Sequence, residues 1–308
     1  MNKVFFLILA IICSSSIALI FKYTEGNRMN RYAVTSANYL IAFLVSIIMF
    51  LYDNSLDLSF SLSISKFLSE TSSVIFSDST LFSAESSFIW AILIGCFAGV
   101  FFFLSFVYYQ KSVKDNGVGL SGTFGKLGIL IPMIFSIILW NEIPTLLQWT
   151  GIVLSLLSII IVNFSIKDLT SKSLNWTLIL LFIFGGMAEF SNKIFQKYSI
   201  IEYKNLFLFF VFFIAFLISI FFTIKEKKPV TNKDILLGIL VGIPNLFSSY
   251  FLIMALNYIT TSVAFPIYSA GSILIINLGG FIIFKEKLSK KDTFAVIMTL
   301  FALVLINM

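Results

Sequence analysis

Two ionisable side chains lie deep inside apolar stretches of this 308-residue sequence. Lys126 lies near the middle of the stretch 117–140, between Gly125 and Gly128, and Glu189 lies in the inner part of the stretch 175–197. A charge near the centre of a bilayer costs about 2.5–3.5 kcal/mol, so such residues usually serve a substrate or an ion. Lys126 is suited to bind a carboxylate or a phosphate, and Glu189 a cation, a coupling ion or Lys126 itself.

Structural roles are the alternative for these charges. Glu189 precedes Lys193 by four residues, which is the order and spacing of a helical ion pair. Lys126 lies too deep for its side chain to reach the water interface easily, which favours ligand binding. Lys22 and Lys193 lie near the ends of their apolar stretches, where we expect them to extend toward the interface or to set orientation.

Two further apolar stretches combine a proline with polar side chains. The polar residues are Tyr268 and Ser269 after Pro266, and Asn245 and Tyr250 after Pro244. Kinked helices that face each other across a repeat interface are typical of transporter sites. We therefore predict that these four residues bind substrate together with Lys126 and Glu189. A tolerated kink with a tyrosine at the lipid interface is the alternative, above all for Tyr250.

Several chemistries have no basis in this sequence. It contains no histidine, which excludes His-based catalysis and His-metal sites, and its two cysteines, Cys13 and Cys96, form no CxxC motif. The segment GVGLSGTFGKLG contains GxGxxG, but a phosphate loop needs glycine and Ser or Thr where Leu120 and Leu127 stand. No catalytic, metal or cofactor site is predicted, and a membrane enzyme that uses carboxylates alone is the remote alternative.

The composition predicts an all-α membrane protein. The chain is 59% hydrophobic and 12% charged, with a mean hydropathy of +1.01, and its apolar residues form blocks of about twenty, the length that crosses a bilayer. Unbroken Leu, Ile and Phe runs exclude the alternating pattern of a barrel. We predict ten transmembrane helices, at 4–22, 32–52, 88–109, 117–140, 146–164, 175–197, 203–224, 235–255, 262–284 and 292–307.

The charged residues between the predicted spans indicate orientation. The net charge of +6 comes mostly from Lys and Arg in short loops on one side, so we predict no nucleic-acid partner. The positive-inside rule places both termini outside, together with the long Ser-rich, acidic stretch 53–87. That stretch is typical of a loosely structured loop or of an amphipathic segment on the membrane surface.

Parts of the first half of the chain recur in the second half. Gly95 and Gly99 align with Gly238 and Gly242 as small-residue faces, and Glu142 aligns with Glu286. Five spans per copy is an odd number, so the copies must have inverted topology. We predict two five-helix repeats, at 1–168 and 169–308. Such repeats place a site at their interface and permit alternating access.

One motif carries a family resemblance. An acidic residue after the fourth span precedes an amphipathic start of the fifth (WNEIPTLLQWTGIVLSLLSIIIV), FKEKLSKKDTFAVIMTLFALVLI repeats this pattern, and lysines end spans one and six. The chain resembles the drug/metabolite transporter superfamily, particularly its ten-span members with paired EamA-like halves. Asn141 and Lys285 replace the glycine of the commoner pattern. The resemblance implies a small-molecule transporter in the plasma membrane, and relatives of this kind suggest cytoplasmic termini, against the charge count.

The substrate class stays open between two chemistries. Lys126 favours a carboxylate-bearing metabolite, and an amino acid would meet both signs of charge if Glu189 also lines the site. Glu189 with Tyr268 would instead suit a quaternary amine such as choline, or a cationic drug, through a cation–π contact. Coupling to a proton or other ion gradient, and the choice between a monomer and a homodimer in the lipid, are further open points. A channel or scaffold would show no saturable flux.

Overall fold

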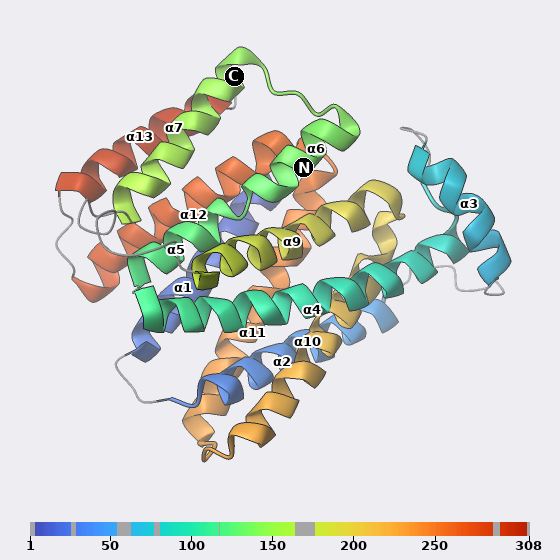
Figure 1. Cartoon of the computed structure of the whole chain (residues 1–308), viewed down its shortest axis with the longest axis horizontal. Coiled ribbons are helices and arrows are strands. Elements are labelled where there is room, and N and C mark those ends of the chain that lie inside the picture. The colour runs from blue at the N-terminus through green and yellow to red at the C-terminus, as the bar shows by residue number, and fades with distance from the viewer. Residues whose placement is uncertain are drawn as a thin grey trace.

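The computed structural model describes residues 4–25, 29–53, 63–76, 81–116, 118–163, 176–285 and 290–306. Within these ranges the chain forms helices and no strand, which confirms the all-α prediction (Figure 1). The helices are α1 (Phe5–Glu25), α2 (Arg31–Leu51), α3 (Ile64–Phe76), α4 (Ala84–Asn116), α5 (Val118–Leu127), α6 (Leu130–Trp140), α7 (Leu146–Asn163), α9 (Trp176–Tyr198), the 3-10 helix η1 (Ile201–Tyr203), α10 (Lys204–Glu226), α11 (Asn232–Leu256), α12 (Thr261–Phe284) and α13 (Lys290–Ile306).

Six helical segments within the described ranges are long and apolar enough to cross a membrane. They are Arg31–Leu51, Ala84–Tyr109, Trp176–Tyr198, Ile201–Glu226, Asn232–Leu256 and Thr261–Gly280. Shorter apolar helical segments at Phe5–Ile20, Phe124–Trp140 and Leu146–Ser158 coincide with three further predicted spans. The architecture is therefore that of a multi-pass membrane protein, and the count of ten spans stays a prediction.

The segment 117–140 differs from the single helix that we predict for it. It is divided into α5 and α6 at Gly128 and Ile129. Pro132 has no N–H to donate to the Gly128 carbonyl four residues earlier, so the Ile131 N–H bonds to that carbonyl instead, at 3.0 Å. The break therefore has a local cause, and it lies directly after Lys126.

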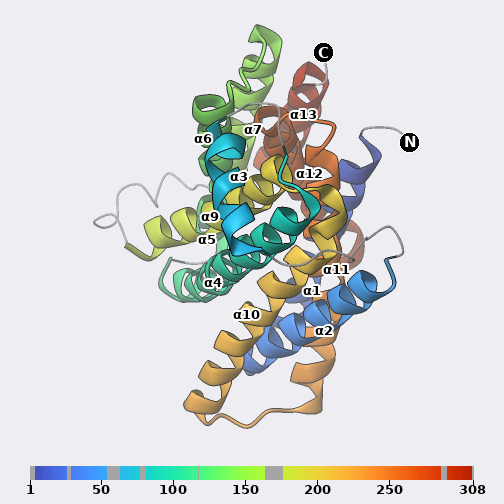
Figure 2. The ribbon, with the colours of Figure 1, turned by 90° about the vertical axis from the view of Figure 1, so that its right-hand side faces the viewer.

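The long stretch 53–87 contains a regular helix. Residues 64–76 form α3, so the alternative of a loosely structured loop is wrong for this part, while 54–62 and 77–80 lie outside the described residues. α4 begins at Ala84, earlier than predicted. In Figures 1 and 2, α3 crosses the N-terminal end of α4 at the edge of the bundle.

Helices from the two halves interleave. α2 packs against α10 and α11, α4 packs against α9 and α10, and α1 packs against α11 and α12. Under the predicted repeat, α1 corresponds to α9 and α4 to α11, so the α1–α11 contact has its counterpart in the α9–α4 contact. The arrangement is thus one bundle in which the most extensive helix contacts join a helix of one half to a helix of the other (Figure 2).

Glycines set the distance between these helices. A Cβ atom on Gly238 would lie 2.4 Å from the Ala37 Cβ, and one on Gly99 would lie 2.6 Å from the Val211 carbonyl oxygen. Contacts this short leave no room for a side chain, so the predicted packing role of the small-residue faces is confirmed. Gly186 does the same for α9, because its Cβ would lie 2.5 Å from the Gly128 carbonyl oxygen.

The neighbouring glycines of α9 give a matched test of this packing. We expect Gly186→Ala to lower the free energy of unfolding by about 1–3 kcal/mol, because backbone cannot yield to the added methyl group. Gly185→Ala should leave stability nearly unchanged, since its Cβ would meet only the Ser105 hydroxyl, at 3.5 Å, and one carbonyl at 3.8 Å. Reversible unfolding of the purified protein in mixed detergent micelles measures both. Equal effects of the two substitutions would contradict the assignment.

Candidate functional site

The side chain of Lys126, on α5, contacts two other helices, α1 and α12. It lies in the last turn of α5, directly before the break between α5 and α6. Its Nζ donates to the Ser14 hydroxyl in α1 at 3.5 Å and lies 5.6 Å from the centroid of the Tyr268 ring in α12. The Tyr268 hydroxyl shares a 2.8 Å hydrogen bond with Ser248 in α11. Residues from both halves therefore surround this ammonium group.

Glu189 brings the opposite charge to the same region from α9. Its carboxylate accepts a 3.1 Å hydrogen bond from Asn192 Nδ2 and acts electrostatically on both Lys126 and Tyr268. It forms no direct ion pair with Lys126 among the described contacts. Both charged side chains keep part of their surface accessible, although protein surrounds them. We call Lys126, Glu189 and Tyr268 the central cluster.

The other predicted site residues divide between two environments. Ser269, beside Tyr268, is fully buried, and its hydroxyl has no hydrogen-bond partner among the described residues. Asn245 donates instead to Asn38 on α2, at 3.1 Å, and Tyr250 lies with its ring 5.3 Å from Lys204 Nζ. The structure thus brings Tyr268 to Lys126 and gives Asn245 and Tyr250 contacts with α2 and α10.

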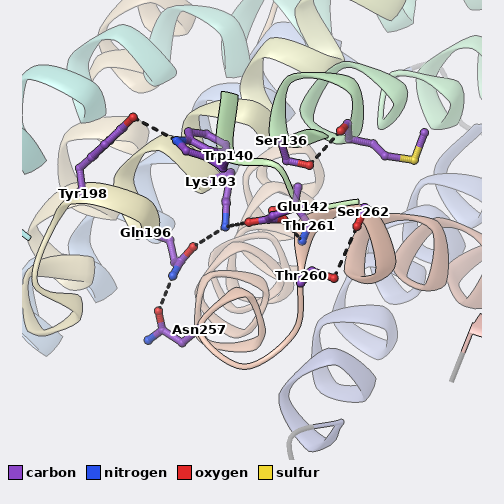
Figure 3. A network of polar contacts seen from close by, with 11 residues as sticks. Ser136, Trp140, Glu142, Lys193, Gln196, Tyr198, Asn257, Thr260, Thr261 and Ser262 are labelled. Carbon is purple, nitrogen blue, oxygen red and sulfur yellow. Dashed lines mark hydrogen bonds and ion pairs between the residues drawn. The ribbon is translucent and has the colours of Figure 1, made fainter. Parts of the chain in front are cut away.

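A second polar network joins the two halves at the end of the bundle where α6 and α9 terminate (Figure 3). Glu142 follows α6, and its Oε1 lies 2.8 Å from Lys193 Nζ on α9. Its Oε2 accepts the backbone N–H of Thr261, the first residue of α12. A carboxylate at this position accepts a hydrogen bond from a backbone N–H at the start of α12, and its negative charge interacts favourably with the positive end of the α12 helix dipole.

Side chains around Lys193 extend this network. Lys193 donates to Gln196 Oε1 at 3.0 Å, and Gln196 donates to Asn257 Oδ1 at 2.8 Å. Lys193 Nζ lies 5.4 Å from the centroid of the Trp140 ring. Trp140 Nε1 donates to the Tyr198 hydroxyl at 3.0 Å. We call Trp140, Glu142, Lys193, Gln196, Asn257 and Thr261 the terminal network.

One sequence-based interpretation of Lys193 is wrong. The helical pair with Glu189 does not form among the described contacts, because Lys193 pairs instead with Glu142 from another part of the chain. Lys193 is only 3% exposed, and its role in orientation at the end of the span stays a prediction. The recurrence of Glu142 as Glu286 was the one sequence signal for that partner. The side chains of Lys22 and Glu286 lie outside the described ones.

Apolar helices of membrane-spanning length around a charged centre define a multi-pass membrane protein. The profile of the EamA-like transporter family matches residues 1–164 and again residues 171–308. The chain therefore belongs to this family and is a membrane transporter of the drug/metabolite type, which confirms the resemblance seen in the sequence.

Comparisons with other proteins add information on the fold alone. A comparison with curated protein sequences finds no match. A solved structure titled "Crystal structure of protein" superposes with a TM-score of 0.66 over 98% of this chain and 95% of its own, at 13% sequence identity. At that identity the likeness shows a shared fold and carries no information on substrate.

The Glu142–Lys193 pair should contribute strongly to stability. We expect Lys193→Met to cost about 3 kcal/mol, because it leaves a carboxylate at a largely buried position without its partner. Lys197→Met, four residues on, removes only a 6.0 Å contact with the Trp140 ring and should cost at most about 1 kcal/mol. Adding Glu142→Gln to Lys193→Met should cost less than the sum of the single effects. Additive losses, measured by unfolding in mixed micelles, would show that the pair does not couple.

Proposed function

We propose that the protein is a secondary transporter that moves a small carboxylate-bearing metabolite, with an amino acid favoured, by alternating access. One observation carries the proposal: Lys126 and Glu189 lie near each other at the centre of the bundle without a direct ion pair. A zwitterion suits such a pair, because its carboxylate can bind Lys126 while its ammonium binds Glu189.

Further features of the central cluster support this substrate class. Ser269 follows Tyr268 in α12, and its buried hydroxyl has no hydrogen-bond partner among the described residues. A buried polar group without a partner costs about 1–3 kcal/mol, which a polar ligand could offset. Lys126 lies at a break in a helix, as substrate-binding residues of transporters often do. A carboxylate bound to Lys126 would replace contacts with groups that are neutral.

A cationic or quaternary-amine substrate is the second possibility that Glu189 and Tyr268 suggest. The geometry favours it less, because the Lys126 ammonium already lies 5.6 Å from the Tyr268 ring. A second cation on that ring would meet like-charge repulsion. Glu189 is also the group that would bind a coupling proton or cation, so coupling to an ion gradient belongs to the same proposal.

Alternating access requires that contacts between the halves break at one end of the bundle and form at the other. We infer ten spans in two inverted halves, in the plasma membrane, with both termini outside. The terminal network then lies at the outer end and holds that end closed. Opening would separate Glu142 from Lys193 and from the Thr261 N–H.

Transport can be tested directly on the purified protein. A thermal-shift screen against amino acids, organic acids, nucleosides and choline-like amines should give hits among carboxylate-bearing compounds. Uptake of a hit into proteoliposomes should saturate, and its dependence on an imposed proton gradient would identify coupling. Absence of saturable uptake for every hit would contradict transport of these solutes.

Substitutions of Lys126 and Glu189 distinguish the substrate classes. We expect Lys126→Met to weaken binding of a carboxylate substrate about tenfold to a hundredfold, because a charge-assisted hydrogen bond contributes about 1.5–3 kcal/mol. Glu189→Gln should weaken binding of an amino acid and leave binding of a simple carboxylic acid unchanged. Lys111→Met, at an exposed residue of α4, is the control. Loss of binding only in Glu189→Gln would overturn the carboxylate assignment.

The terminal network should control access from its end of the bundle. In a background with Cys13→Ala and Cys96→Ala, a cysteine at Ser14 reports access to Lys126 through an impermeant thiol reagent. We expect Glu142→Gln to raise its labelling rate from that end about tenfold, because the open state gains population. Glu226→Gln, in the surface pair with Lys228 at the other end, is the matched control. Unchanged labelling in Glu142→Gln would show that the network is not a gate.

A further inference from the structure

The helix α3 has an apolar surface that the protein covers only in part. Phe67 and Val74 are buried and pack in one cluster with Phe82. Ile64, Leu68 and Ile75 are 71%, 64% and 39% exposed. At 100° per residue these three lie on one stripe, next to the buried stripe of Phe67 and Val74.

Apart from its last residue, Phe76, the remainder of α3 is polar. Ser65, Lys66, Ser69, Ser72 and Ser73 occupy the opposite side of the helix, and Phe76 is its exposed last residue. α3 is therefore amphipathic, with an apolar arc that is wider than the stripe of Phe67 and Val74 buried against the protein. A helix of this pattern, with modest overall hydrophobicity, is typical of the membrane interface.

Contacts with α4 hold α3 beside the start of a membrane-spanning segment. The Phe67 ring lies 5.5 Å from the Phe82 ring and 6.5 Å from the Trp90 ring. The apolar span of α4 begins at Ala84, and at 1.5 Å per residue Trp90 lies about 9 Å further along it. α3 thus packs against Phe82, shortly before α4, and against the first turns of its apolar segment, and tryptophans such as Trp90 are enriched where membrane-spanning helices meet the lipid interface.

The charges of α3 are already engaged by the protein. Lys66 pairs with Glu85 at 3.1 Å, and Glu70 accepts the Ser83 backbone N–H at 3.1 Å, directly before α4. Burial raises the pKa of Glu70, but hydrogen bonds from Ser83 and Ser86 and the charge of Lys66 outweigh it, so the pKa is lowered overall. These bonds fix α3 on α4 and leave no free cation to attract anionic headgroups.

We propose that α3 lies in the lipid interface, with Ile64, Leu68 and Ile75 inserted into the boundary between headgroups and acyl chains. Lipid is the occupant that the position favours. The stripe borders the point where α4 enters the membrane, and further along α4 Leu93 and Phe97 are also exposed apolar residues on a membrane-spanning segment. The association depends on apolar insertion, because the charges of α3 are paired with α4.

Spin labels on the full chain test this arrangement. Single cysteines replace Leu68 and Ile75 on the apolar stripe, and Ser69 and Ser73 on the polar side, in the background with Cys13→Ala and Cys96→Ala. The labelled protein is reconstituted into phosphatidylcholine vesicles, with and without phosphatidylglycerol. We expect labels at Leu68 and Ile75 to collide more with lipid-soluble oxygen than with a water-soluble nickel chelate. Labels at Ser69 and Ser73 should show the reverse, in both lipid mixtures.

Three outcomes would overturn the proposal. Equal access of the nickel chelate to both sides of the helix would place α3 in water. Dipolar broadening between labels at Leu68 would show that a second copy of the chain covers the stripe. If labels at Leu68 and Ile75 contact oxygen only in vesicles that contain phosphatidylglycerol, charge attraction rather than apolar insertion holds α3 on the membrane. The test does not depend on the transported substrate, so its result is separate from that of the uptake experiment.

Discussion

The absence of water in the bilayer is the constraint on which this structure depends. A polar group inside a membrane protein must find its partner in the protein or in a ligand. Lys193 forms an ion pair with Glu142, and the Thr261 N–H donates a hydrogen bond to the same carboxylate. Among the described residues, Lys126 contacts the Ser14 hydroxyl and the Tyr268 ring directly and no carboxylate. This difference separates a structural charge from one that is suited to a substrate.

Close helix packing is what brings these groups together. Gly186 allows α9 to touch the backbone at Gly128, where α5 ends and α6 begins. The same contact holds Glu189 of α9 near Lys126 of α5. A bulkier residue at Gly186 would separate the helices that carry the two charges, so packing and the proposed function are linked at one point.

Much of the architecture was predictable because its signals are local. Apolar blocks of membrane-spanning length, the positions of Lys126 and Glu189, and the paired motifs at Glu142 and Glu286 can all be found in the linear sequence. Pro132 is a local cause of the break between α5 and α6. The position of this break, at Gly128 and Ile129, is known only from the structure. The partner of Lys193 was not predictable, since Glu142 lies about fifty residues away in the chain and the i,i+4 pattern pointed to Glu189.

Hydropathy, segment length and motif are properties of short segments, so the linear sequence suffices to predict a helical membrane protein of the EamA type with two charges deep inside apolar stretches. The tertiary structure alone decided which charges meet. It placed Lys193 with Glu142, Lys126 with Tyr268, and α3 on the first turns of α4. Such contacts depend on how helices from distant parts of the chain cross. The spacing of side chains along one helix does not predict that crossing.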